Sequence, residues 1–190
     1  MHGVTTESQG AKAPLAGAGE LRVLLTADQI ASRVRALGLE IARDYDGERP
    51  LLVAVLKGAC MFQADLARAS ALDLELDFLS VSSYGSDTTA QGPPRLISDV
   101  RGDVAGRHVL LCEGVVDSGR TVSYILDALG SRRPASLVVA ALLNKLPCRK
   151  IEVPLRYVGF SIGADFVVGY GLDRAERYRN LPFIGIPEEM

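Results

Sequence analysis

The sequence is poor in the residue types that form metal centres and disulfide frameworks. Its 190 residues include three cysteines, two histidines and no tryptophan. The cysteines are far apart in the sequence and form no CxxC motif, so they match no familiar zinc-binding or redox spacing. Cys60 and Cys112 lie among apolar residues, which favours buried and reduced thiols. We therefore expect neither a zinc module nor a disulfide-dependent fold.

The sequence also lacks a strong charge of either sign and any long apolar run. Twenty-one basic and 23 acidic residues give a formal net charge of −2, which offers no broad basic surface to nucleic acid or to an anionic membrane. No apolar run approaches the roughly 20 residues that cross a bilayer, and the start of the chain has no apolar signal-peptide core. We expect a mobile tail over residues 1–19, one domain over residues 20–190 and a cytoplasmic protein without nucleic-acid or membrane partners.

Hydrophobic residues are plentiful, at 48% of the chain, and their periodicity indicates an α/β fold. Thr26 and Gln29 have the spacing of a capping box, and apolar residues then recur on one helical face at Ile30, Val34, Leu37 and Ile41. Uniformly apolar segments predict strands that are covered on both faces, at 51–56 and 137–143. Between these strands we expect a helix over 59–70 and a strand over 74–78 whose acidic residues form a wetter face. This order predicts a largely parallel central sheet flanked by helices, with the ligand site at the carboxyl ends of the strands.

The segment VLLCEGVVDSGRT, residues 109–121, carries the clearest chemical signal. We expect a strand over 108–112, an acidic loop that contains Glu113, and a helix over 121–129. Backbone N–H groups around Gly119 at a helix N-terminus would form a concave anion site, to which the Ser118 and Thr121 hydroxyls can add donors. The plainer interpretation is a capped helix start with a chance acidic residue. The preceding strand and Glu113 favour a phosphate site.

This segment resembles the signature of the type I phosphoribosyltransferases. Other motifs in the same order extend the resemblance to hypoxanthine-guanine phosphoribosyltransferases: VLKGACMFQADL (55–66), SVSSYG (80–85), LLNK (142–145), FVVGYGLD (166–173) and ERYRNLPFIG (176–185). The resemblance implies the type I fold, with a small hood subdomain and a flexible active-site loop. It further implies purine salvage, in which the 5-phosphoribosyl group of phosphoribosyl pyrophosphate is transferred to N9 of hypoxanthine or guanine. Mg²⁺ as cofactor and a homodimer or homotetramer are implied as well.

The resemblance also implies a role for individual residues. Asp117 would be the general acid/base beside the purine N7. The ribose and its 5-phosphate would be bound by Glu113, Asp117, Ser118, Gly119, Arg120 and Thr121. The pyrophosphate would be bound by Lys57, Gly58 and Arg179. The purine would be bound by Lys145, Phe166 and Val167. Magnesium would be held near Glu113 and Asp173, and the lid loop would contain Ser83 and Tyr84.

Each of these residues also has an ordinary structural explanation. Asp117 could be a helix N-cap, Lys57 a solvated strand end, and Phe166 and Val167 core residues. The role of Lys145 has a clear physical basis, because an ammonium group has donors only and therefore favours a 6-oxo over a 6-amino group.

The sequence departs from the family pattern in three places. Gly114 replaces the second signature acid, Pro93 and Pro94 lie in the expected lid, and Ser98 stands where a basic residue is common. Two alternatives stay open at this point. One is a non-catalytic regulator of the same fold that senses phosphoribosyl pyrophosphate or a nucleotide. The other is an enzyme that prefers xanthine.

Overall fold

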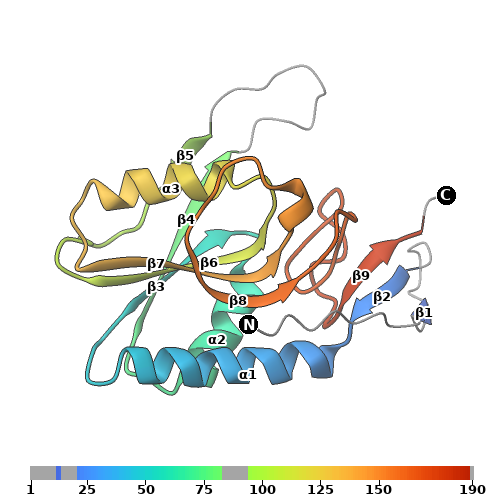
Figure 1. Cartoon of the computed structure of the whole chain (residues 1–190), viewed down its shortest axis with the longest axis horizontal. Coiled ribbons are helices and arrows are strands. Elements are labelled where there is room, and N and C mark those ends of the chain that lie inside the picture. Colours follow the sequence, from blue (N-terminus) through green and yellow to red (C-terminus); the bar gives the residue numbers. More distant parts are fainter. Residues whose placement is uncertain (1–11, 14–20, 83–93, 189–190) are drawn as a thin grey trace.

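The structure, a computed structural model, describes residues 12–13, 21–82 and 94–188, and a six-stranded sheet forms its centre. The strand order is β5-β4-β3-β6-β7-β8. The parallel strands are β3 (Leu51–Leu56), β4 (Glu75–Ser82), β6 (His108–Val116), β7 (Ser136–Asn144) and β8 (Leu155–Ser161). Strand β5 (Arg95–Ser98) runs antiparallel to β4 at one edge. The prediction of a largely parallel α/β sheet is confirmed (Figure 1).

Helices cover both faces of this sheet. Helices α1 (Ala27–Asp44) and α2 (Cys60–Ser70) lie on one face, and α3 (Arg120–Gly130) lies on the other (Figure 1). The predicted capping box is present, since Thr26 Oγ1 accepts from the Gln29 N–H and Gln29 Oε1 accepts from the Thr26 N–H. Helix α1 approaches α2 closely at Gly38, where a Cβ atom would lie 2.5 Å from the carbonyl carbon of Ala69. Strand β3 is buried on both faces, as its apolar sequence predicts.

A second, smaller sheet joins the two ends of the described chain. It consists of β1 (Lys12–Ala13), β2 (Leu21–Leu25) and β9 (Ile184–Pro187), all antiparallel. This sheet corresponds to the expected hood. Lys12 and Ala13 fall within the stretch expected to be a tail, and they pair with residues 22 and 21 of β2. The rest of that stretch lies outside the described residues.

Strand β6 extends further than the sequence suggested. The predicted end was residue 112, whereas pairing with β7 continues through Glu113, Val115 and Val116. The two β-branched valines suit an extended backbone and support the longer strand. Glu113 therefore lies within the sheet and not in an acidic loop.

The prediction of a wetter acidic face on β4 is wrong. Leu76 and Phe78 are the exposed side chains of this strand, at 48% and 40%. Glu75 is instead paired with Arg107, and the Asp77 carboxylate accepts the N–H of Arg101. Leu76 and Phe78 share a face with the α2-covered residues of β3, but α2 leaves these two side chains of β4 exposed.

Candidate functional site

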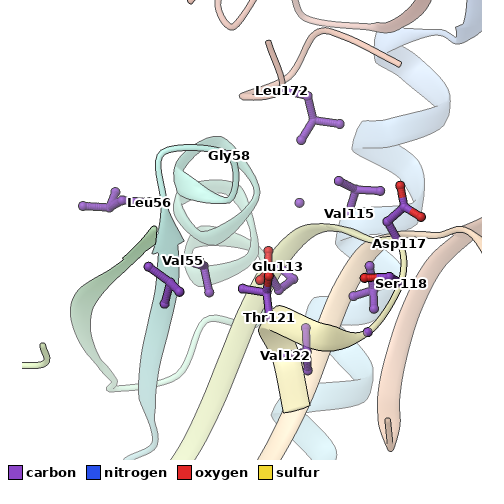
Figure 2. A pocket seen from close by; sticks show the side chains of 14 residues that line it. Val55, Leu56, Gly58, Glu113, Val115, Asp117, Ser118, Thr121, Val122 and Leu172 are labelled. Carbon is purple, nitrogen blue, oxygen red and sulfur yellow. The ribbon is translucent and has the colours of Figure 1, made fainter. Parts of the chain in front are cut away.

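A pocket of about 230 Å³ opens at the carboxyl ends of β3 and β6, where the predicted ligand site lies. Figure 2 shows Glu113, Asp117, Ser118 and Thr121 around the connection from β6 to α3, with Leu172 facing them from a separate segment. Six predicted site residues line this pocket: Gly58, Glu113, Asp117, Ser118, Gly119 and Thr121. The structure thus brings the expected pyrophosphate loop and the expected phosphate loop to one hollow. Leu172 was not predicted here, and its apolar side chain gives no sequence signal of such a position.

The connection from β6 to α3 has the geometry of an anion-binding turn. Gly119 is the N-cap of α3 and has φ = +84°, and a Cβ atom there would lie 2.2 Å from the Ile151 carbonyl oxygen. Glycine is therefore required by both conformation and space. Ser118 Oγ accepts from the Arg120 N–H at 3.4 Å, and the Arg120 residue itself is exposed. The free N–H groups of the first turn of α3 and the nearby hydroxyls can bind a phosphate.

A second segment holds the rear of this turn, and sequence reasoning missed it. The Arg149 guanidinium donates to the carbonyl oxygens of Asp117, at 3.1 Å, and Val116, at 3.4 Å. Asn144 Oδ1 accepts from the same guanidinium at 2.5 Å. The Ser118 carbonyl accepts from the N–H groups of residues 150 and 151. These bonds occupy the carbonyl groups of Val116, Asp117 and Ser118, and no motif in the sequence indicates the pairing.

Glu113 is a buried carboxyl group, with 8% of the residue exposed. Burial raises its pKa to about 8, and a hydrogen bond from the Gly114 backbone opposes this only partly. In the absence of a cation the group is therefore mainly protonated at neutral pH. Its neighbour Gly114 has no positive φ, but a Cβ atom there would lie 2.8 Å from the Gly58 carbonyl oxygen. The position expected to have the second acid thus coincides with a close approach of the loop that contains Gly58.

Asp117 lies beside Lys145 at the mouth of the pocket. Asp117 Oδ2 is 3.9 Å from Lys145 Nζ, and the two side chains are 54% and 7% exposed. Because Gly119 is the N-cap of α3, Asp117 does not serve as its cap. Phe166 is 56% exposed and so is not a core residue, whereas Val167 is buried and only 5% exposed. Lys145 directly follows the carboxyl end of β7, and Phe166 lies in the segment that follows β8.

The two cations expected to bind pyrophosphate share an acidic partner that sequence reasoning did not identify. Lys57 Nζ lies 2.9 Å from Glu176 Oε2, and Arg179 Nη2 lies 3.2 Å from Glu176 Oε1. Arg179 also contacts Asp173 Oδ1 at 2.8 Å and donates to the Gly171 carbonyl at 2.8 Å. Asp173, expected near magnesium, therefore lies in an ion pair. Its second oxygen accepts from the Glu176 N–H at 2.8 Å.

The described residues contain no cluster of three acidic, histidine or cysteine side chains that could bind a metal by themselves. Mg²⁺ commonly takes only one or two protein carboxylates and completes its shell with water and substrate phosphates. Glu113 and Asp173, the two carboxylates expected near Mg²⁺, are donors of the kind that this second mode uses. Ser83 and Tyr84, the expected lid residues, lie outside the described residues.

The chain is similar to known proteins over most of its length. The family model "Phosphoribosyl transferase domain" matches residues 23–175. A hypoxanthine-guanine phosphoribosyltransferase of Mycobacterium avium is 50% identical over 169 residues, covering 86% of this chain and 83% of the relative. The enzyme of that name from Bacillus subtilis is 43% identical, covering 87% of this chain and 92% of the relative. The bifunctional protein TilS/HprT of Listeria monocytogenes is 47% identical over 87% of this chain, but the chain spans only 26% of that relative's length.

Solved structures show the same relationship. A hypoxanthine phosphoribosyltransferase from Staphylococcus aureus superimposes with a TM-score of 0.83 at 39% identity, covering 88% of this chain and 91% of the other. A hypoxanthine-guanine phosphoribosyltransferase from Bacillus anthracis gives a TM-score of 0.80 at 38% identity, covering 86% and 95%. Fold and sequence therefore agree over most of the chain.

Proposed function

This chain belongs to the phosphoribosyltransferase family, and we propose that it is a hypoxanthine-guanine phosphoribosyltransferase of purine salvage. It joins N9 of hypoxanthine or guanine to C1 of the ribose of phosphoribosyl pyrophosphate, giving IMP or GMP and pyrophosphate. The observation that carries the proposal is the pairing of an anion-binding turn at Gly119 with Asp117 beside the buried Lys145. Named relatives at 43% to 50% identity support the same activity.

The turn at residues 117–121 binds the 5-phosphate in this proposal. The N-terminus of α3 supplies partial positive charge and N–H donors, and the glycine at position 119 lets the backbone approach the ligand. Arg149 fixes the carbonyl groups of Val116 and Asp117, so that the neighbouring N–H groups are oriented before the ligand arrives. A rigid donor set costs little reorganisation on binding.

Lys145 and Asp117 act on the purine. The Lys145 ammonium donates to the 6-oxygen, while the 6-amino group of adenine would leave a buried donor unpaired. Asp117 accepts the proton at N7 as N9 forms its bond to C1. Phe166 stacks its exposed ring on the purine, and the Val167 backbone contacts the edge of the base.

The reaction forms the N9–C1 bond and breaks the bond between C1 and the pyrophosphate oxygen, which leaves with the bonding electrons. Lys57 and Arg179 stabilise the negative charge on the leaving pyrophosphate, and Gly58 offers it a backbone N–H donor. Mg²⁺, held by Glu113, Asp173 and substrate oxygens, would supply further neutralisation of the pyrophosphate charge. Ser83 and Tyr84 would close over the site and exclude water.

We expect this activity in a cytoplasmic homodimer or homotetramer. No helix within the described ranges is long and apolar enough to cross a membrane. Support for self-association comes from exposed apolar side chains along the β3-β4-β5 edge, namely Leu56, Leu76, Phe78 and Ile97. Sedimentation analysis of the wild type and of Phe78→Asp tests this assignment, because the variant should dissociate if this surface is the interface.

The decisive experiment supplies the protein with Mg²⁺, phosphoribosyl pyrophosphate and one purine at a time. We expect turnover of hypoxanthine and guanine and little turnover of adenine. Lys145→Ala should narrow the difference between hypoxanthine and adenine while the protein stays folded. A preference for xanthine would revise the substrate. Binding of phosphoribosyl pyrophosphate without turnover of any purine would instead support the regulator.

A further inference from the structure

We propose that Glu176 occupies the pyrophosphate site of the free protein as an internal competing carboxylate, and that it leaves when pyrophosphate or phosphoribosyl pyrophosphate binds. The inference rests on the proposed function, which assigns Lys57 and Arg179 to the pyrophosphate. It adds a residue that controls how tightly this half of the substrate and the product are held.

The geometry places the carboxylate between the two cations. One oxygen of Glu176 lies 2.9 Å from Lys57 Nζ and the other lies 3.2 Å from Arg179 Nη2. The two cations come from distant parts of the chain, since Lys57 is 119 residues from Glu176 whereas Arg179 follows Glu176 by three residues. An anion that contacts both cations through separate oxygens imitates the way in which a pyrophosphate would contact them.

The backbone around Glu176 directs the side chain toward the cations. Ala175, Glu176 and Tyr178 all have positive φ, at 52°, 64° and 76°, a region that residues other than glycine rarely occupy. The Asp173 carboxylate holds this turn by accepting the Glu176 N–H at 2.8 Å. The turn thus keeps an uncommon conformation whose result is the bridge between Lys57 and Arg179.

The side chain can nevertheless leave readily. The side chains of Glu176 and Lys57 are 65% and 63% exposed, so water can solvate both after they separate. Hydrogen bonds to Lys57 and Arg179 lower the pKa of Glu176, so the carboxylate is charged at neutral pH. Pyrophosphate carries more negative charge and more acceptor oxygens than one carboxylate. It therefore displaces Glu176 from Lys57 and Arg179. When it departs, Glu176 pairs with them again and favours release.

The test measures the affinity of Mg²⁺-pyrophosphate by calorimetry and the KM for phosphoribosyl pyrophosphate by steady-state kinetics. Glu176→Gln keeps the size of the side chain and removes its charge. We expect roughly 2- to 5-fold tighter pyrophosphate binding and a similarly lower KM, because an exposed ion pair is weak and its loss changes affinity only by a small factor. The matched control is Glu48→Gln, which removes the same charge beside His108 at the opposite end of the sheet and should change neither value.

A double variant tests whether the gain passes through Lys57. In a Lys57→Met background, Glu176→Gln should give a smaller gain, because one of the two cations that Glu176 neutralises is gone. If the wild type binds pyrophosphate and Glu176→Gln binds it equally or more weakly, the inference is wrong while the proposed function stands. If the wild type neither binds pyrophosphate nor turns over a purine, the proposed function fails and this inference fails with it.

Discussion

Gly114 is the position at which a single added carbon should report on the contact between β6 and the loop that contains Gly58. A Cβ atom there would lie 2.8 Å from the Gly58 carbonyl oxygen and 3.1 Å from Leu172 Cδ2. The backbone of Gly114 has no positive φ, so the cost of a side chain is steric and not conformational. A backbone oxygen cannot rotate aside as a flexible side chain would, so the loop must move.

Overpacking of this kind costs about 1–3 kcal/mol. For a domain of this size, each kcal/mol lowers the melting temperature by roughly 2–4 °C. We therefore expect Gly114→Ala to melt about 2–12 °C below the wild type and to raise the KM for phosphoribosyl pyrophosphate, because Gly58 is displaced. Gly102→Ala is the matched control, since a Cβ atom at Gly102 has no neighbour within 4 Å.

Gly114→Asp then separates the steric effect from the missing carboxylate. It places the same Cβ atom against Gly58 and adds a carboxylate where the family signature is expected to have its second acid. If that acid helps to bind the ribose or Mg²⁺, a charge-assisted hydrogen bond of about 1.5–3 kcal/mol should improve KM about 10- to 150-fold relative to Gly114→Ala. Equal KM values and magnesium requirements for the two variants would refute the carboxylate argument. A melting temperature of Gly114→Ala equal to that of the wild type would refute the steric one.

Three further variants test the site. Asp117→Asn should keep its melting temperature and phosphoribosyl pyrophosphate binding while turnover falls roughly 10²- to 10⁴-fold, and an unchanged kcat would show that Asp117 is not the acid/base. The folded protein holds the Glu113 proton more tightly than the unfolded chain. Between about pH 4.5 and 8 Glu113 is therefore ionised mainly in the unfolded chain, which lowers the free energy of unfolding progressively as the pH rises. The melting temperature of Glu113→Gln relative to wild type, measured without Mg²⁺, should thus rise from pH 5 to pH 9, and a constant difference would contradict the burial argument. Arg149→Leu should weaken binding of the 5-phosphate of GMP more than it weakens pyrophosphate binding, whereas equal losses in the two titrations would indicate a general structural role.

Local patterns in the sequence determined the layered architecture and the glycine turn before α3. The capping box at Thr26 and the apolar run of β3 depend on residues near one another in the chain, so their spacing predicts them directly. The same is true of the turn at Gly119, whose glycine, hydroxyl groups and following helix lie within a few residues. Family motifs added roles for Asp117 and Lys145, and the structure brings these two side chains within 3.9 Å.

Only the tertiary structure decided the contacts between distant segments. The extension of β6 through Glu113 depends on pairing with β7. The burial that raises the pKa of Glu113 occurs where β6 meets other segments of the chain at the pocket. The exposed apolar side of β4 depends on which strands the helices cover, and alternation within the strand cannot reveal this. The Lys57–Glu176 ion pair joins residues 119 positions apart. Such contacts arise from the packing of whole elements, whereas sequence periodicity reports only on neighbours along the chain.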